Sequence, residues 1–233
     1  TLNVLKAAHQ AQIKRIVFTS TALTVGTKTE PDQPFTEDHW NENDKIPYIY
    51  AKTQAEQKAW EFTKEKELDL VAVLPTGIIG PYFYRYTPTT IIFRDYVQGT
   101  VRGVTPGIFN FIDVRDVAKA HILAYENPNA SGRYICGTEA ISVKELFEML
   151  ESEFPELKFP RRKLSSFIIN LFALFSRKHD RTEANMFINF RLFYDSSKIR
   201  TDLGWTPRPI EESLRDTINW VRTTPITYLP YYQ

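Results

Sequence analysis

The sequence predicts an α/β protein with a doubly wound parallel β-sheet and a smaller C-terminal lobe. Segments with the helical period alternate with short apolar runs, a pattern typical of a parallel sheet covered on both faces. The apolar runs, such as residues 16–18 and 68–75, are continuous, as expected of strands that are buried on both sides. With 233 residues, 42% of them apolar and 14% aromatic, the chain is long enough for a sizeable core.

The first elements follow in that alternating order. Residues 2–10 have helical periodicity, and because the chain opens inside this helix with only Thr1 as a cap, we expect a further segment to precede it. Residues 15–20 read as a buried strand. Residues 22–47 contain glycine, prolines and many polar side chains, which predicts a long loop over the end of that strand.

The middle of the chain continues the sheet and then leaves it. Residues 48–67 have a stripe of alanines at helical spacing, and residues 68–75 form the next predicted strand. Past Pro81 an aromatic-rich loop precedes a predicted helix over residues 91–98, which we interpret as the start of a separate lobe. The chain is expected to return to the sheet at residues 110–113.

Capping and helix-breaking residues predict the remaining elements. These are a helix over 114–125 capped near Asp113, a strand at 133–137, a helix from the Ser142–Glu145 capping box to Phe154, a helix near 165–176, a strand at 192–195, a short helix ended by Gly204 and a last helix after Pro209. The apolar segment 164–175 is interpreted as a core helix, with a helix lying at a membrane interface as the alternative.

Composition excludes several classes of protein. The 29 basic and 28 acidic residues nearly cancel, so no net field draws the chain to nucleic acid. The single cysteine, Cys136, cannot form an internal disulfide, and no apolar stretch reaches the roughly 18 residues of a membrane span. No signal peptide is visible, so a reducing, cytoplasmic setting is predicted. The four histidines lack metal-ligand spacing, and we predict no metal site.

Two short stretches carry the chemistry. The predicted strand at residues 15–20 ends in hydroxyls, and the helix after the loop sets Tyr48 and Lys52 four positions apart on one face. A free phenol has a pKa of about 10, so acid/base work near neutral pH requires a nearby cation to lower it. A hydroxyl, a phenol and an ammonium at a strand end are typical of proton transfer to a carbonyl or alcohol, which indicates an oxidoreductase.

Context separates this pair from chance. The spacing of tyrosine and lysine arises roughly 0.7 times by chance in such a chain, and Tyr194 with Lys198 shares it without a helix beneath both residues. For the hydroxyl, Thr21 is preferred over Ser20, because neighbours on a strand point to opposite faces and Thr21 precedes a small alanine.

Six motifs in order resemble the extended short-chain dehydrogenase/reductases, from the first residue to about residue 222. The motifs are TLNVLKAA, KRIVFTSTA, YIYAK followed by AE, LPTGIIGP, FIDVRDVAKAHI and YDSSKIRTDLGWTPRP. Within that superfamily of NAD-dependent epimerases and dehydratases, the chain is most similar to the dihydroflavonol-reductase-like branch and to hopanoid-associated epimerase-like proteins.

The resemblance implies roles for particular residues. Thr21, Tyr48 and Lys52 would be the catalytic hydroxyl, the acid/base tyrosine and the lysine that also binds the nicotinamide ribose. The implied binding residues for the cofactor, NADP or NAD, are Thr19, Tyr48, Lys52, Pro75, Thr76, Gly77 and Ile78. For the substrate they are Ala22, Leu23, Tyr82, Tyr84 and Arg85. An equal alternative for the loop around Arg85 is that it belongs to the core of the lobe.

The resemblance also implies a partial Rossmann-like fold in two parts. Residues 1–82 and 109–138 would be the remainder of the dinucleotide-binding domain, and residues 83–108 and 139–233 the substrate-binding lobe. The glycine-rich turn that seats a pyrophosphate does not occur in the sequence, so the N-terminal strands are expected to be missing. The chain would then be a fragment of a longer protein or a truncated form that holds cofactor poorly.

These observations predict an NAD(P)-dependent oxidoreductase that acts on a ketone or secondary alcohol of a small molecule. A sugar epimerase or dehydratase is the second hypothesis, although Leu74 and Gly77 stand where those enzymes usually have arginine and asparagine. A cofactor-free relic with a regulatory or structural role is the third. The family also implies a possible homodimer through the helix that carries Tyr48. His121 is expected to be a structural histidine, and Cys136 to be inert packing.

Overall fold

The computed structural model describes residues 1–42, 45–101, 103–164 and 190–224. The predicted helix near 165–176, and with it nearly all of the apolar segment for which a membrane-interface alternative was left open, lies outside the described residues. Among the helices that are described, none combines the length and the apolar character required to cross a bilayer.

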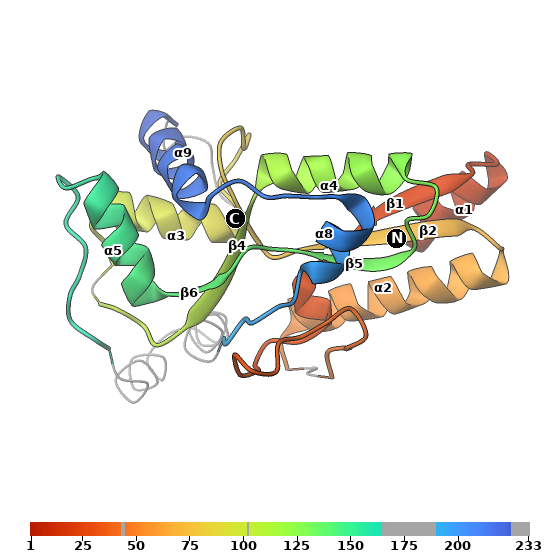
Figure 1. The fold of residues 1–233 in the computed structure, drawn as a ribbon, viewed down its shortest axis with the longest axis horizontal. Helices are drawn as coiled ribbons and strands as arrows, with labels where there is room; N and C mark the ends of the chain where they lie inside the picture. Colours follow the sequence, from red (N-terminus) through yellow and green to blue (C-terminus); the bar gives the residue numbers. More distant parts are fainter. Residues whose placement is uncertain (43–44, 102, 165–189, 225–233) are drawn as a thin grey trace.

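A parallel sheet of three strands forms one half of the described chain. Its strands are β1 (Arg15–Thr19), β2 (Asp69–Pro75) and β5 (Gly132–Cys136), in the order β1-β2-β5. Helix α2 (Pro47–Glu65) lies on one side of the sheet and α4 (Val114–Glu126) on the other (Figure 1). Helix α1 (Leu2–Gln10) packs on the α2 side, where Leu5 meets Ala59 and Leu70. The predicted alternation of helices and parallel strands is therefore present, and the α/β class is confirmed.

The central strand β2 shows why its apolar run is continuous. Leu70, Ala72 and Leu74 pack toward the α1 and α2 side, whereas Val71 and Val73 pack toward α4. Every residue of β2 after Asp69 is buried, because both faces of the strand are covered. β1 has a strand neighbour on one side only within the described residues, and its residues are half-buried or exposed.

A second, smaller sheet organises the other half. β3 (Gly77–Ile79) pairs in parallel with β4 (Ile108–Asp113), which pairs antiparallel with β6 (Ala140–Ser142). Helices α3 (Pro88–Val97), α5 (Val143–Glu153) and α9 (Ile210–Thr223) gather beside this sheet (Figure 1). Their apolar faces share one core of aromatic and aliphatic residues, among them Phe93, Phe147 and Ile218.

Capping residues lie at the helix ends that the sequence predicts. The Ser142 hydroxyl accepts from the amide of Glu145, and the Glu145 carboxylate accepts from the amide of Ser142, which confirms the capping box of α5. Asp113 caps α4, and Gly204 has a φ of +62° at the C-terminus of α8 (Ser197–Leu203).

Three local predictions differ from the structure. Helix α3 begins at Pro88 rather than at residue 91, because Thr87 and Thr90 form a capping box and proline suits the first helical turn. The predicted strand at 192–195 forms only one isolated bridge within the described residues, between Phe35 and Tyr194. β3 and β6 were not predicted, because runs of three residues carry no periodic signal.

The packing of α8 bears on the predicted division into two parts. The predicted lobe includes residues 139–233, but Ile199 and Leu203 of α8 and the following Trp205 pack against Val71, Val73 and α4 of the parallel sheet. The Trp205 indole donates to the Asp116 carbonyl of α4 at 2.9 Å. Along this stretch the chain thus belongs to the parallel-sheet core, and the remaining boundaries stay predictions.

Candidate active site

Helix α2 brings Lys52 to the carboxyl end of β1. The Lys52 ammonium donates to the carbonyl oxygen of Thr19 at 3.4 Å, and its nitrogen lies 5.8 Å from the ring centroid of Phe18. Burial lowers the pKa of Lys52, and the negative charge of Glu56 opposes that effect. The result is a partly desolvated cation beside the strand end, where we predict the chemistry.

Tyr48 lies one helical turn before Lys52, in the first turn of α2. The helix begins at Pro47, whose fixed φ and missing N–H suit that position. The Tyr48 side chain is 56% exposed, so its ring is accessible from solvent. The spacing of four residues places Tyr48 and Lys52 on the same face of the helix.

The two candidate hydroxyls differ in their bonding. Ser20 donates its proton to a carboxylate oxygen of Glu56 at 2.5 Å, in a buried setting. The Thr21 hydroxyl accepts from the amide of Leu23 at 3.4 Å and caps the short 3₁₀ turn η1 (Ala22–Thr24). Both residues are buried. Within the described part of the chain, the Ser20 proton has an acceptor, whereas the Thr21 proton has none.

The predicted nicotinamide border follows β2 directly. Pro75 is buried at the end of the strand, and the amide of Thr76 donates to the Cys136 carbonyl at 3.1 Å. The Thr76 hydroxyl oxygen is buried with no hydrogen-bond partner among the described residues. Gly77 lies so close to β4 that a Cβ there would stand 2.9 Å from the Phe111 ring, which explains the need for glycine. Ile78 follows Gly77 in β3 and is half-buried.

The residues implied to contact substrate fall into two groups. Ala22 is fully buried in a core cluster, and Leu23 packs at the margin of the same cluster. Tyr82 and Tyr84 are 81% and 74% exposed, and the Arg85 guanidinium lies 5.1 Å from the Tyr84 ring centroid. The described side chains therefore place Ala22 and Leu23 beside the β1 end and leave both tyrosine rings at the surface.

A buried ion pair beside the site was missed by the sequence analysis. The Arg133 Nε atom donates to Glu56 Oε1 at 2.7 Å, and the two side chains are 8% and 0% exposed. Glu56 follows Lys52 by one helical turn, which was a usable signal that a charged side chain lies near the lysine. Arg133 is 77 residues further along the chain, and no local pattern joins the two.

His121 is a structural histidine. Its Nδ1 atom lies 2.8 Å from the Val117 carbonyl, which can only accept, so Nδ1 carries a hydrogen and donates. Its Nε2 atom lies 2.7 Å from the Thr19 hydroxyl. Both ring nitrogens are therefore satisfied, as expected for a core histidine.

The second tyrosine–lysine pair does not form a site. The Tyr194 hydroxyl donates to the Gly26 carbonyl at 2.8 Å, whereas the Lys198 ammonium donates to the Arg133 carbonyl at 2.8 Å. The helix α8 begins only at Ser197, so the two residues do not share a helical face. The geometry agrees with setting this pair aside.

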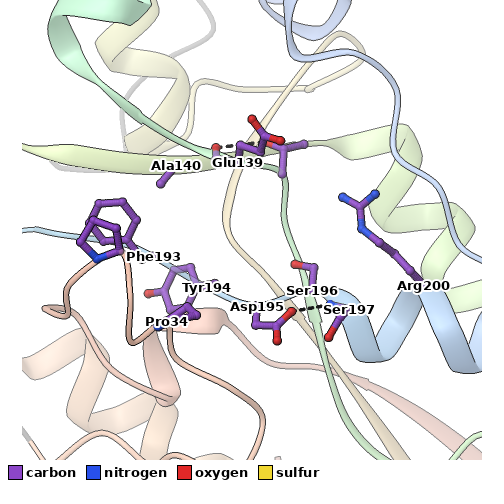
Figure 2. Close-up of a pocket in the computed structure, with 11 residues that line it drawn as sticks. Pro34, Glu139, Ala140, Phe193, Tyr194, Asp195, Ser196, Ser197 and Arg200 are labelled. Atoms are coloured by element: carbon purple, nitrogen blue, oxygen red, sulfur yellow. Dashed lines mark hydrogen bonds between the residues drawn. The ribbon is translucent and has the colours of Figure 1, made fainter.

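A groove of about 390 Å³ lies at the start of α8 (Figure 2). Figure 2 shows Phe193 and Arg200 on opposite sides of it, with Glu139 and Ala140 along one edge. None of the predicted site residues lines this groove. The groove is thus separate from the residues at the end of β1.

Comparison with known proteins agrees with the motifs. A model described as the NAD dependent epimerase/dehydratase family matches residues 1–137. Cinnamoyl-CoA reductase 2 of Medicago truncatula is 34% identical over 226 residues, covering 94% of this chain and 62% of the plant protein. The bifunctional dihydroflavonol 4-reductase/flavanone 4-reductase of Malus domestica is 30% identical over 181 residues, covering 69% of this chain and 49% of that protein.

A solved structure shows the same fold. The yeast methylglyoxal/isovaleraldehyde reductase complexed with NADPH superimposes with a TM-score of 0.73 at 21% identity, covering 94% of this chain and 67% of that chain. This chain spans between about half and three fifths of the length of the two plant relatives. The family match, the relatives and the parallel sheet together show that the chain belongs to the NAD-dependent epimerase/dehydratase family, with relatives in its dihydroflavonol-reductase-like branch.

Proposed function

We propose that this chain is part of an NAD(P)-dependent oxidoreductase that reduces a ketone, or oxidises a secondary alcohol, of a small molecule. The observation that carries the proposal is the position of Lys52, which α2 holds against the end of β1 with Tyr48 one turn away. The plant relatives are named reductases, which supports the same reaction class.

Tyr48 would donate the proton to the substrate oxygen during reduction and accept it during oxidation. The Lys52 ammonium would favour the phenolate form and so lower the pKa of Tyr48 toward neutrality. Thr21 would hydrogen-bond the substrate oxygen and hold it near the phenol. This assignment is supported by Lys52, which contacts the end of β1, and by Tyr48, which lies one turn before it on α2.

The cofactor would be NADP or NAD, which supplies or removes the hydride when bound. Lys52 and Tyr48 would contact its ribose, and residues 75–78 would border its nicotinamide. The fit is supported by Thr76, whose buried hydroxyl has no partner among the described residues and would gain one from a polar group of the cofactor. Thr19 would help to bind the cofactor by holding the Lys52 ammonium, which donates to its carbonyl oxygen at the end of β1.

The reductase is preferred to a sugar epimerase or dehydratase. Leu74 is fully buried in the sheet and Gly77 packs against Phe111, so neither position offers a polar group to a nucleotide sugar. An apolar or aromatic substrate would suit Tyr82 and Tyr84, and Arg85 would suit an anionic group. A cytoplasmic location and a homodimer through α2 remain part of the same proposal.

The test is a matched pair of substitutions on one helix, made in the full-length native polypeptide. Tyr48→Phe should still bind NADPH or NADH, because Lys52 and residues 75–78 remain, and should lose at least about 100-fold in turnover, because the acid/base group is removed. Tyr50→Phe is the control, since Tyr50 lies on the same helix and is 49% exposed. Undiminished turnover by Tyr48→Phe would refute the assignment, and absence of any nicotinamide binding would favour a cofactor-free relic.

A further inference from the structure

The Glu56 carboxylate has hydrogen-bond donors at both of its oxygens close to the candidate site. Its Oε1 atom accepts from Arg133 at 2.7 Å and from the Trp60 indole at 3.3 Å. Its Oε2 atom accepts from Ser20 at 2.5 Å and lies 2.8 Å from the Thr24 hydroxyl, whose single proton also has the Thr21 carbonyl at 2.8 Å. A fully buried carboxylate is tolerated only when it is paired and hydrogen-bonded, and both oxygens of Glu56 meet that condition.

Arg133 extends this cluster to the loop before α2. Its Nη1 atom donates to the carbonyls of Glu37 and His39, both at 2.7 Å, and Nη2 donates to Thr24 at 2.9 Å. The guanidinium also lies 3.8 Å from the Trp40 ring centroid. The pair therefore ties together β5, η1, α2 and the loop that leads to Tyr48.

The hydroxyls of Ser20 and Thr21 differ in their hydrogen bonds to this cluster. A serine or threonine hydroxyl has one proton to donate. Ser20 donates that proton to Glu56. The Thr21 hydroxyl accepts from the Leu23 amide, and no acceptor for its own proton lies within the described residues. Of the two, Thr21 alone retains a donor for a substrate oxygen.

We propose that Glu56, paired with Arg133, is a positioning residue that retains the Ser20 hydroxyl and leaves Thr21 as the donor of the active site. The same carboxylate faces Lys52 from one turn further along α2 and favours its charged form. Among the described residues, Lys52 also meets the Thr19 carbonyl and the Phe18 ring of β1, and Tyr48 lies one turn before it on α2. His121 of α4 reaches the same strand end through the Thr19 hydroxyl. This inference rests on the proposed oxidoreductase function.

The first test measures both turnover and the urea midpoint of two variants, made in the full-length native polypeptide. Thr21→Ala should lower turnover about 100-fold. Because it removes only the long 3.4 Å cap to the Leu23 amide, it should lower the urea midpoint less than Ser20→Ala does. Ser20→Ala should keep turnover within about threefold but lower the urea midpoint clearly, since a buried carboxylate loses a donor. If Ser20→Ala abolishes turnover and Thr21→Ala does not, the inference is overturned while Tyr48→Phe still tests the proposed function separately.

The second test requires no turnover. NMR titration of the Lys52 side chain should give a lower pKa in Glu56→Gln than in the wild type, because the neighbouring negative charge is gone. Glu61→Gln is the control, since Glu61 is on the same helix and touches only Lys58 at the surface. An unchanged Lys52 pKa in folded Glu56→Gln would overturn the role of Glu56 at Lys52, and Glu56→Asp should restore part of the effect.

Discussion

Arg133 and Glu56 place opposite charges inside the protein, and Glu56 is on the helix that also carries Tyr48 and Lys52. Such a pair contributes little net stability, because desolvation offsets the attraction between the charges. Removing one member is costly, however, since the other remains buried without its partner. At the scale of single residues, this pair joins β5, α2 and the loop before α2 next to the candidate site.

Arg133→Met should lower the free energy of unfolding by about 3 kcal/mol or more, because Glu56 would remain as an unpaired buried charge. Urea unfolding followed by circular dichroism measures the change. Arg161→Met is the matched control, since the Arg161 side chain is 88% exposed and its carboxylate contact is at the surface. Equal midpoints for the two variants would contradict the account of this ion pair.

Helix ends are the feature of the elements that local sequence encodes most directly. The Ser142–Glu145 box was predictable from four residues, and so was the glycine that ends α8. In contrast, Thr87 and Thr90 cap α3 with two threonines, which the usual pattern of serine followed by glutamate does not identify. Short strands were missed for a similar reason, because three residues contain less than two periods of a strand.

The N-terminal cap of α5 should be worth about 1 kcal/mol. Ser142→Ala removes the acceptor for the Glu145 amide. We expect the urea midpoint to fall, while the slope of the free energy of unfolding against urea concentration stays unchanged. Ser152→Ala, at an exposed position of the same helix, is the control and should leave the midpoint nearly unchanged. A loss of similar size in both variants would show that the cap is not the cause.

The sequence identifies the residues of the candidate site, and their roles stay predictions. Tyr48, Lys52 and the strand-end hydroxyls follow from short motifs, and α2 does bring Lys52 to the end of β1. The choice between Ser20 and Thr21 rested on strand alternation, whereas the structure offers a different reason, which is the carboxylate of Glu56. That reason depends on a contact with a residue 36 positions away, which no local pattern contains.

At the scale of the whole molecule, an ionic network joins the start of α4 to α9. Arg115 donates to Asp113 at 2.8 Å and to Asp216 of α9 at 2.6 Å. Arg208, in the segment between α8 and α9, donates to Asp116 at 3.1 Å. These contacts connect the parallel-sheet half of the described chain to the helices around the smaller sheet.

This network predicts a loss of stability in acid. Burial alone would raise the pKa of Asp113, but the hydrogen bonds and charges of Arg115 and Arg208 outweigh it and hold the pKa below its ordinary value. A carboxyl with a depressed pKa stabilises the fold above its unfolded pKa of about 3.9 and loses that contribution as the pH falls through the folded value.

Thermal unfolding between about pH 6 and pH 2.5 measures the effect. The wild-type midpoint should fall below about pH 4, and Asp113→Asn should show a lower midpoint at pH 6 and a shallower fall. Asp32→Asn, in the loop before α2, is a control outside the network. A fall of the same steepness in Asp113→Asn and the wild type would show that Asp113 does not contribute.

We propose that α2 and the end of β1 form a site for proton transfer coupled to hydride transfer. The most direct measurement uses NADPH or NADH deuterated at the transferable position, the full-length native polypeptide and a panel of small ketones. We expect deuterium at the carbinol carbon of the product with the wild type, and almost none with Tyr48→Phe at saturating cofactor. Cofactor binding without any deuterium transfer by the wild type, or equal transfer by both proteins, would contradict the account.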